Sequence, residues 1–175
     1  MGYNRHTIMK KLLFFFATLC LVACNGNDPE GGSTTKGDYV DLGLESGTKW
    51  KTQNEHRATD YYNLFDYETA LDEFGRNLPS KEQWEELRIY CHWEWTGSGM
   101  KVTGPNGKSI VLPAAGYRYT NGYVTYVNEE GFYWSSTPDG SESAWYMGFG
   151  YGHLGMQNDG NRIWGQSDCH HSAYS

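Results

Sequence analysis

The chain has 175 residues, with 14 Lys and Arg against 21 Asp and Glu and a formal net charge of −7. This balance disfavours a nucleic-acid partner, because binding phosphates requires a basic face. The 22 glycines and the 16% of aromatic residues are typical of a small, turn-rich domain with an aromatic core. They disfavour a long helical bundle or a disordered chain.

The first 23 residues have the layout of a bacterial export signal. A basic stretch, Arg5–Lys11, precedes the apolar stretch Leu12–Val22, which is shorter than the about 20 residues that cross a bilayer. Leu21-Val22-Ala23-Cys24 resembles the lipobox of bacterial lipoproteins, which implies that Cys24 is lipidated and becomes the new N-terminus. A plain cleaved signal and an uncleaved anchor are the alternatives.

Residues 24–37 are rich in Gly, Asn, Ser and Thr and predict a flexible tether. Acyl chains on Cys24 would hold the protein at the outer membrane without crossing it. Asp28 and Glu30 resemble the surface-export signal of Bacteroidetes lipoproteins, which implies a position facing the cell exterior. The remaining residues, 38–175, are enough for one domain and too few for two of ordinary size.

The residue patterns after the tether predict an α+β domain. Alternation of apolar and polar residues predicts strands at 38–42 and 49–52. Apolar residues at helical spacing predict a helix over 67–74, with Asp66 as its N-cap and Gly75 at its end.

A second helix begins with the capping box Ser80–Gln83, and Trp84, Leu87 and Cys91 share its buried face. After Cys91 we expect strands and loops without a further helix. The pair Asn106-Gly107 predicts a tight hairpin turn. Its strands are expected at 100–103 and 109–112, and later strands at 123–127, 132–136, 145–149 and 163–164.

Four blocks of the sequence resemble, in order and spacing, the Fibrobacter succinogenes major paralogous domain, a family abundant in Bacteroidetes lipoproteins. They read YVDLGLESGTKW (39–50), NLPSKEQWEEL (77–87), VTGPNGKSIVLPAAGYR (102–118) and GFYWSSTP (131–138). The resemblance implies a C-type-lectin-like fold, with two helices packed on a twisted antiparallel sheet and a loop-rich C-terminal half. Family members tend to end in a β-branched strand, whereas residues 168–175 do not, so we expect a poorly paired sheet edge.

Two catalytic arrangements compete with simpler interpretations. The similar formylglycine-generating enzymes act through a Cys pair, for which this chain offers only Cys91 and Cys169; the same two could instead form a disulfide in an oxidising compartment. Ser135 or Ser136 with His153 and Asp159 could be drawn as a triad, but a nucleophile-elbow motif is lacking. We therefore expect no enzymatic activity and no cofactor.

Metal binding has two candidate segments. Cys169-His170-His171 offers nitrogen and sulfur ligands, but adjacent His side chains in an extended chain point in opposite directions. Asn158-Asp159-Gly160-Asn161 offers the oxygen ligands that calcium prefers, as in sugar-binding C-type lectins. The sugar-binding motifs of those lectins are missing, and turn formation is the ordinary role of such a cluster, so we expect no metal.

The last 60 residues carry many aromatic side chains. By alternation we expect Trp145, Met147 and Phe149 to face the core and Tyr146 to face outward. Tyr with Gly, Ser and Asn in loops makes an adaptable recognition surface, which favours a non-catalytic module that binds a glycan or a protein. The predicted contact residues are Tyr146, Tyr151, His153, Asn158, Asp159, Asn161 and Trp164.

Two other functions fit the same features. One is a structural adhesin or a pilus-like assembly subunit whose sheet edge pairs with a neighbour. The other is a display protein diversified by a retroelement, because such proteins use a C-type-lectin-like scaffold with variable residues in a comparable C-terminal segment.

Overall fold

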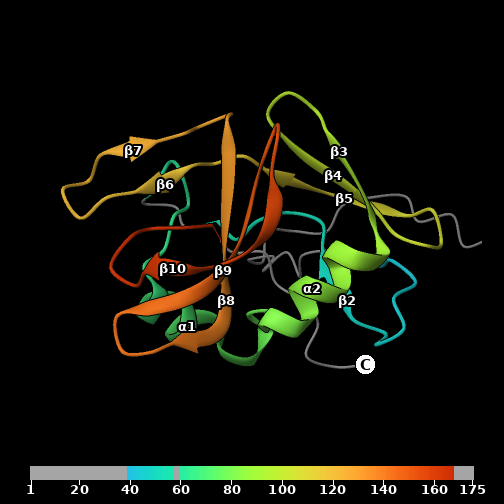
Figure 1. Ribbon diagram of the computed structural model, residues 1–175, viewed down its shortest axis with the longest axis horizontal. Helices are drawn as coiled ribbons and strands as arrows, with labels where there is room; N and C mark the ends of the chain where they lie inside the picture. The colour runs from blue at the N-terminus through green and yellow to red at the C-terminus, as the bar shows by residue number, and fades with distance from the viewer. Residues whose placement is uncertain (1–38, 57–59, 168–175) are drawn as a thin grey trace, which may run out of the picture. The chain divides into compact units, whose positions relative to one another are not determined.

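The computed structural model describes residues 39–56 and 60–167 (Figure 1). The export signal, Cys24, the tether and the segment Cys169-His170-His171 lie outside the described residues, as does any pairing of Cys91 with Cys169. Within the described ranges, no helix is long and apolar enough to span a membrane.

The described residues form a mixed α+β domain. Its helices are α1 (Tyr67–Phe74) and α2 (Lys81–Tyr90), with a short 3-10 turn at Gly75–Asn77 between them. Its strands are β1 (Tyr39–Asp41), β2 (Lys49–Lys51), β3 (His92–Trp95), β4 (Gly99–Thr103), β5 (Ser109–Pro113), β6 (Tyr117–Arg118), β7 (Val124–Thr125), β8 (Glu130–Asp139), β9 (Ser143–Gly150) and β10 (Leu154–Asn161). After α2 the described chain has no further helix, as predicted.

Both helices begin and end where their capping residues predict. The Asp66 side chain accepts a hydrogen bond from the Thr69 backbone N–H at 3.0 Å, and Gly75 follows α1 with a φ of 51°. Ser80 and Gln83 form the predicted capping box at the start of α2. These contacts satisfy backbone groups that a helix end leaves without partners.

The β4–β5 hairpin is present with the predicted connection over 104–108, and of the Asn106-Gly107 pair only Gly107 has a positive φ, of 81°. Thr103 pairs with Ser109, so the connection has five residues. Asn106 does not adopt a positive φ; its side chain donates to the Asp41 carbonyl at 2.8 Å and accepts from Lys108. Through the first of these hydrogen bonds, Asn106 connects the loop to β1.

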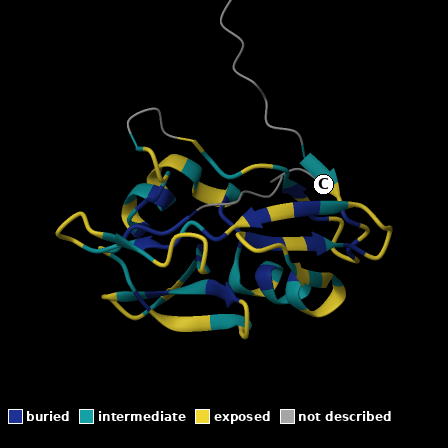
Figure 2. Ribbon diagram, turned by 90° about the horizontal axis from the view of Figure 1, so that it is seen from above, coloured by how far each residue is buried: buried dark blue, intermediate teal, exposed yellow. Residues whose placement is uncertain are grey.

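A three-stranded antiparallel sheet, β10-β9-β8, lies between two layers of core. Neighbouring residues of a strand point to opposite faces: Tyr133 belongs to the core cluster on the α2 side, and Trp134 to the cluster on the α1 side. Figure 2 shows buried positions in the interior strands and on parts of both helices. The sheet is therefore covered on both faces.

Tryptophans connect the two core clusters. Trp84 of α2 lies 4.8 Å from Trp50 between ring centroids, and its indole N–H donates to the Trp134 carbonyl at 3.1 Å. The Trp134 indole in turn donates to the Phe65 carbonyl at 2.9 Å. Because Trp84 and Trp134 are fully buried, each hydrogen bond removes the penalty of an unpaired polar group.

The segment Gly165–Ser167 pairs with other parts of the domain, whereas residues 168–175, on which the expected poorly paired edge depends, lie outside the described residues. Gln166 pairs with Phe65, exchanging hydrogen bonds of 2.8 Å in both directions, and the Ser167 N–H donates to the Phe132 carbonyl. Backbone pairing does not depend on side-chain type, so Gly, Gln and Ser can occupy this position without a β-branched residue.

Two predicted strands near this segment differ from the structure. The strand predicted at 123–127 is reduced to β7, because Tyr126 adopts a left-handed φ of 58° that ends the strand. The strand predicted at 163–164 is a turn, in which the Trp164 N–H donates to the Asn161 carbonyl at 3.0 Å. Both turns bring aromatic rings towards β6.

Candidate functional site

The predicted contact residues lie on the β9–β10 hairpin and just after it, but in other positions than expected. Asn158, Asp159 and Asn161 were predicted in loops and belong to strand β10. Tyr151 and His153 lie in the turn between the two strands and are exposed. Strand β10 pairs with β9 around a bulge between Gln157 and Gly160, which the sequence pattern does not reveal.

The hairpin separates these residues instead of gathering them. The turn next to Leu154 and the opposite end of β10 at Asn161 are roughly 20 Å apart at the rise of an extended strand. Tyr151 and His153 therefore cannot share one small ligand with Asn161. The predicted seven-residue site is not a single site.

Tyr146 is half-buried instead of facing outward. Its ring lies 5.8 Å from that of Phe132, and its hydroxyl donates to Asp159 Oδ1 at 3.0 Å. Burial raises the pKa of the Tyr146 phenol, and the neighbouring Asp159 carboxylate raises it further. The sheet is covered by core on both faces, so alternation alone does not make Tyr146 a solvent-facing residue.

Trp164 and Tyr146 lie in a cluster of aromatic rings that surrounds a pocket. Trp164 stacks on Tyr117 with ring centroids 5.2 Å apart and an interplanar angle of 25°, and Tyr126 stacks on the same ring at 5.9 Å. The pocket has a volume of about 220 Å³. We refer to it as the aromatic pocket; it is lined by Tyr117, Tyr126, Glu130, Phe132, Tyr146, Trp164 and Gln166.

Local backbone geometry puts these rings together. Gly116, with a φ of 69°, precedes β6 at a point where a Cβ would overlap the Thr125 carbonyl oxygen of β7. Tyr126 then turns the chain, and its carbonyl accepts hydrogen bonds from the N–H groups of Glu129 and Glu130. Glu130 thereby starts β8 at the edge of the pocket.

The lining of the aromatic pocket includes one carboxylate and one amide side chain. Gln166 is 1% exposed, and no described residue donates to its side-chain oxygen. Glu130 is half-buried, and no Lys or Arg of the described ranges forms an ion pair with it. The Tyr117 hydroxyl donates to the Tyr119 hydroxyl. A ligand that brings hydrogen-bond donors would find an acceptor in the Glu130 carboxylate.

Five of the pocket residues were not predicted as contacts: Tyr117, Tyr126, Glu130, Phe132 and Gln166. Three of them, Tyr117, Tyr126 and Phe132, belong to the aromatic side chains whose abundance in the C-terminal part indicated a binding surface. Gln166 and Glu130 carry no signal in the sequence, because their position depends on pairing with Phe65 and on the turn at Tyr126.

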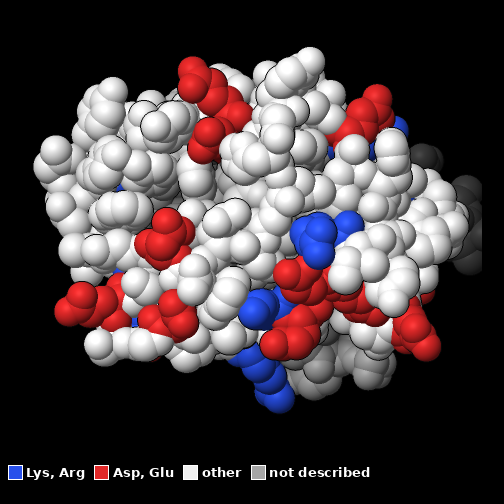
Figure 3. Space-filling model, viewed as in Figure 1, with Lys and Arg blue, Asp and Glu red and all other residues white. Residues whose placement is uncertain are grey.

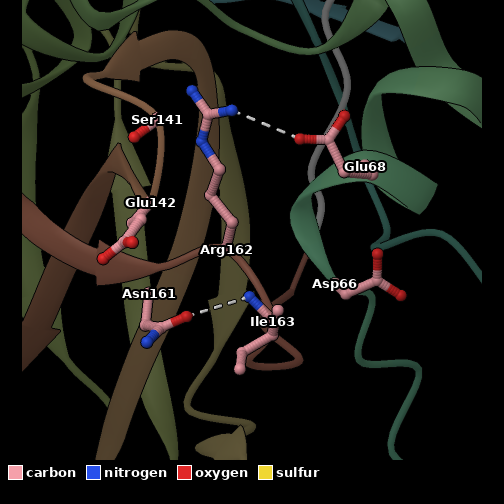
Figure 4. A pocket seen from close by; sticks show the side chains of 7 residues that line it. All are labelled: Asp66, Glu68, Ser141, Glu142, Asn161, Arg162 and Ile163. Carbon is pink, nitrogen blue, oxygen red and sulfur yellow. Dashed lines mark hydrogen bonds and ion pairs between the residues drawn. The ribbon is translucent and has the colours of Figure 1, made fainter.

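A larger and more polar hollow of about 680 Å³ lies between α1 and the β9–β10 hairpin. Figure 4 shows Arg162 extended across it towards Glu68. The guanidinium donates to the Ser143 carbonyl at 3.0 Å, to the Gly140 carbonyl at 2.8 Å and to Glu68 at 3.3 Å. Its charged group already holds the hairpin to the helix, so this hollow offers less for a ligand than the aromatic pocket does.

The residues considered for catalysis are not brought together. Ser135 is fully buried and accepts from the Thr137 N–H at 3.1 Å, and Asp159 accepts from Tyr146. His153 follows the end of β9 at which Gly150 pairs with Glu130, the first residue of β8. Ser135 follows Glu130 by five positions in β8, a distance of roughly 16 Å in an extended strand.

The described residues do not provide a metal cluster or an activated thiol either. No three His, Cys, Asp or Glu side chains of residues 39–56 and 60–167 lie close enough to hold a metal ion. Cys91 packs at the end of α2 against the core, and burial raises the pKa of its thiol to about 11. A thiol with this pKa is a poor nucleophile near neutral pH.

Comparison with known proteins gives one match. A family model described as a domain of unknown function (DUF8237) matches residues 93–166. This range contains every residue that lines the aromatic pocket and all seven predicted contact residues. Neither the curated proteins nor the solved structures gave a match. The similarity thus covers the part of the chain from Trp93 in β3 to Gln166, which carries the pocket.

Proposed function

We propose that this chain is a non-catalytic binding domain that holds a glycan or a protein ligand in the aromatic pocket. The observation that carries the proposal is the stacked group of Tyr117, Tyr126 and Trp164, which lines a pocket together with the Glu130 carboxylate. Aromatic side chains of this kind give a large contact area at low entropic cost. They also stack on the apolar C–H faces of sugar rings.

The distribution of charge supports an approach from the β6–β7 side. Figure 3 shows mainly uncharged residues over β6 and β7, with Lys and Arg gathered towards the centre and lower edge of that face. Tyr123 in the loop between these strands is 63% exposed, and Tyr126 is 42% exposed. Exposed aromatic groups next to a pocket are typical of a recognition surface.

For the fold and family, we propose a C-type-lectin-like domain of the Fibrobacter succinogenes major paralogous type. The four sequence blocks support this, together with two short helices that precede a series of hairpins. The pairing of Gln166 with Phe65 supplies a closing segment in the place where the family has its last strand.

For the location, we propose a lipoprotein anchored through Cys24 in the outer membrane and facing the cell exterior. The support is the sequence of residues 1–37 alone. Metabolic labelling with a palmitate analogue, compared between the native chain and Cys24→Ala, tests the anchor. Labelling that persists in Cys24→Ala would contradict it.

The test of binding uses the purified full-length protein on glycan and protein arrays. Trp164→Ala should lose binding, because it removes a ring of the pocket, whereas Tyr151→Ala should keep it, because Tyr151 is 87% exposed and lies in the hairpin turn. Circular dichroism must show that both variants are folded. Binding that only Tyr151→Ala abolishes would move the site to the turn, and binding to neither array would contradict the proposal. A parallel array with a chelator tests for calcium.

A further inference from the structure

We propose that the aromatic pocket selects an alkylammonium cation, either a lysine side chain or a quaternary ammonium group. The inference rests on the proposed function, since it names the chemical group that the pocket binds. It depends on three features of the described residues: the rings, the acceptors and the size of the pocket.

The lining rings suit a cation. Tyr and Trp present negative π faces that attract an ammonium group within about 6 Å of the ring centroid. Trp164 and Tyr126 each stack on Tyr117, with centroids 5.2 and 5.9 Å away. Phe132 packs on the same ring at 5.1 Å and an interplanar angle of 79°. A small cation in the pocket would thus lie near several rings at once.

The acceptors and charges of the pocket also suit a cation. Glu130 brings a carboxylate to the edge of the pocket. Among the described residues, no Lys or Arg lines the pocket. Arg118, which follows Tyr117 in the chain, forms an ion pair of 2.5 Å with Asp60. A cation would therefore meet an opposite charge without competition from a basic residue of the lining.

The tyrosine phenols report the negative field. Burial raises the pKa of Tyr117 and of Tyr146; the next causes are the neighbouring Tyr119 for Tyr117 and the Asp159 carboxylate for Tyr146, and Glu130 adds a smaller contribution to both. A carboxylate that disfavours two nearby phenolate anions stabilises a positive charge in the same place.

The volume limits the size of the group that binds. At about 220 Å³, the pocket is smaller than the roughly 300–1,000 Å³ that is typical of sites for drug-sized ligands. It has room for a side-chain terminus or a small head group. A longer ligand would leave the pocket towards the exposed Tyr123 and Tyr126.

The experiment compares choline with its neutral isostere, 3,3-dimethylbutan-1-ol, by tryptophan fluorescence and calorimetry on the purified full-length protein. Choline should bind at least about tenfold more tightly than the isostere. Glu130→Gln should weaken choline binding about tenfold, since it removes one charge and keeps the shape of the side chain. Glu129→Gln is the matched control, because Glu129 is an exposed neighbour outside the pocket lining and its substitution should leave affinity unchanged.

The outcomes separate this inference from the proposed function. Equal affinity for choline and the isostere would contradict the preference for a cation. Equal effects of Glu130→Gln and Glu129→Gln on choline affinity would contradict it as well. So would the absence of binding to both choline and the lysine analogue. If an array ligand binds the native protein and does not bind Trp164→Ala, the proposed binding function stands even when the cation preference is refuted. A second titration with N-acetyl-lysine methylamide distinguishes the sources: preference for it over choline assigns the lysine side chain, and the reverse assigns a quaternary ammonium group.

Discussion

The Tyr146 hydroxyl donates a hydrogen bond of 3.0 Å to Asp159 Oδ1 across the β9–β10 pair. The bulge between Gln157 and Gly160 gives β10 the extra residues that bring Asp159 to this position. Asp159 was a candidate for calcium and for a catalytic triad, and the structure shows it engaged with a phenol instead. The contact connects the hairpin to the aromatic pocket, which Tyr146 lines.

Tyr146→Phe should lower the free energy of unfolding by about 1 kcal/mol, because it removes this hydrogen bond while Asp159 stays accessible to water. Urea unfolding measures the change. Tyr151→Phe is the control, since Tyr151 is 87% exposed, and it should change stability by less than about 0.5 kcal/mol. Equal effects of the two variants would show that the hydrogen bond contributes nothing measurable.

Alkaline pH should lower the stability of the native chain more than it lowers the stability of the Tyr146→Phe variant. The pKa of Tyr146 is raised in the folded protein, so its stabilising contribution is complete below the ordinary tyrosine pKa of about 10 and is lost as the pH rises through the raised value. Thermal unfolding between about pH 9 and 11 should show a shallower decline for the variant. Parallel curves for the two proteins would argue against this linkage.

Gly116→Ala should be much more harmful than Gly122→Ala, although both glycines have a positive φ, of 69° and 83°. The left-handed backbone costs either alanine about 1 kcal/mol. At Gly116 the new Cβ would also overlap the Thr125 carbonyl oxygen, whereas at Gly122 it meets nothing within 4 Å. We expect a further loss of about 2 kcal/mol or more for Gly116→Ala in chemical unfolding.

The same pair of variants tests how the aromatic pocket is built. Gly116→Ala should separate β6 from β7 and reduce the contact of Tyr117 with Tyr126, which aromatic proton shifts in NMR spectra would reveal. Spectra that match those of Gly122→Ala would mean that the backbone accommodates the Cβ without moving these rings.

Asp60 should make the native protein sensitive to acid. Burial raises the pKa of Asp60, but hydrogen bonds from Arg118 and from the backbone N–H groups of Leu64 and Tyr62 outweigh this effect and lower it. The contribution of the Asp60 carboxylate to the free energy of unfolding is therefore present above the ordinary Asp pKa of about 4, and it is lost as the pH falls through the lowered pKa. Asp60→Asn should be less stable at pH 7 and should lose less stability between about pH 4 and 2, as urea unfolding at each pH would show.

Cys91 should react slowly with alkylating agents. Burial, and next the Glu86 carboxylate, raise the pKa of its thiol to about 11, so the thiolate fraction at pH 8 is on the order of a hundredfold below that of a free cysteine. Iodoacetamide labelling followed by peptide mass spectrometry separates Cys91 from the other cysteines. A rate at pH 8 equal to that of glutathione would contradict the raised pKa and would reopen a role for this thiol in chemistry.

Local patterns in the sequence were sufficient to predict the helices and most strands. The Asp66 and Ser80 caps, the apolar spacing around Trp84 and the β4–β5 hairpin depend on residues close together in the chain. Such short-range interactions are visible in a sequence because the partners lie within a few positions of one another. The α+β class followed from the order of these elements.

The sequence by itself thus determined the two helices, most of the strands and the aromatic content, whereas the tertiary structure decided the extent of β10 and which aromatic rings meet. Tyr146 was expected to face solvent by alternation, but the sheet is covered on both faces. Trp164 reaches Tyr117 through a turn after β10, and Gln166 enters the pocket wall by pairing with Phe65, about 100 positions away in the chain. Contacts over such separations depend on how the layers pack, which no local pattern records.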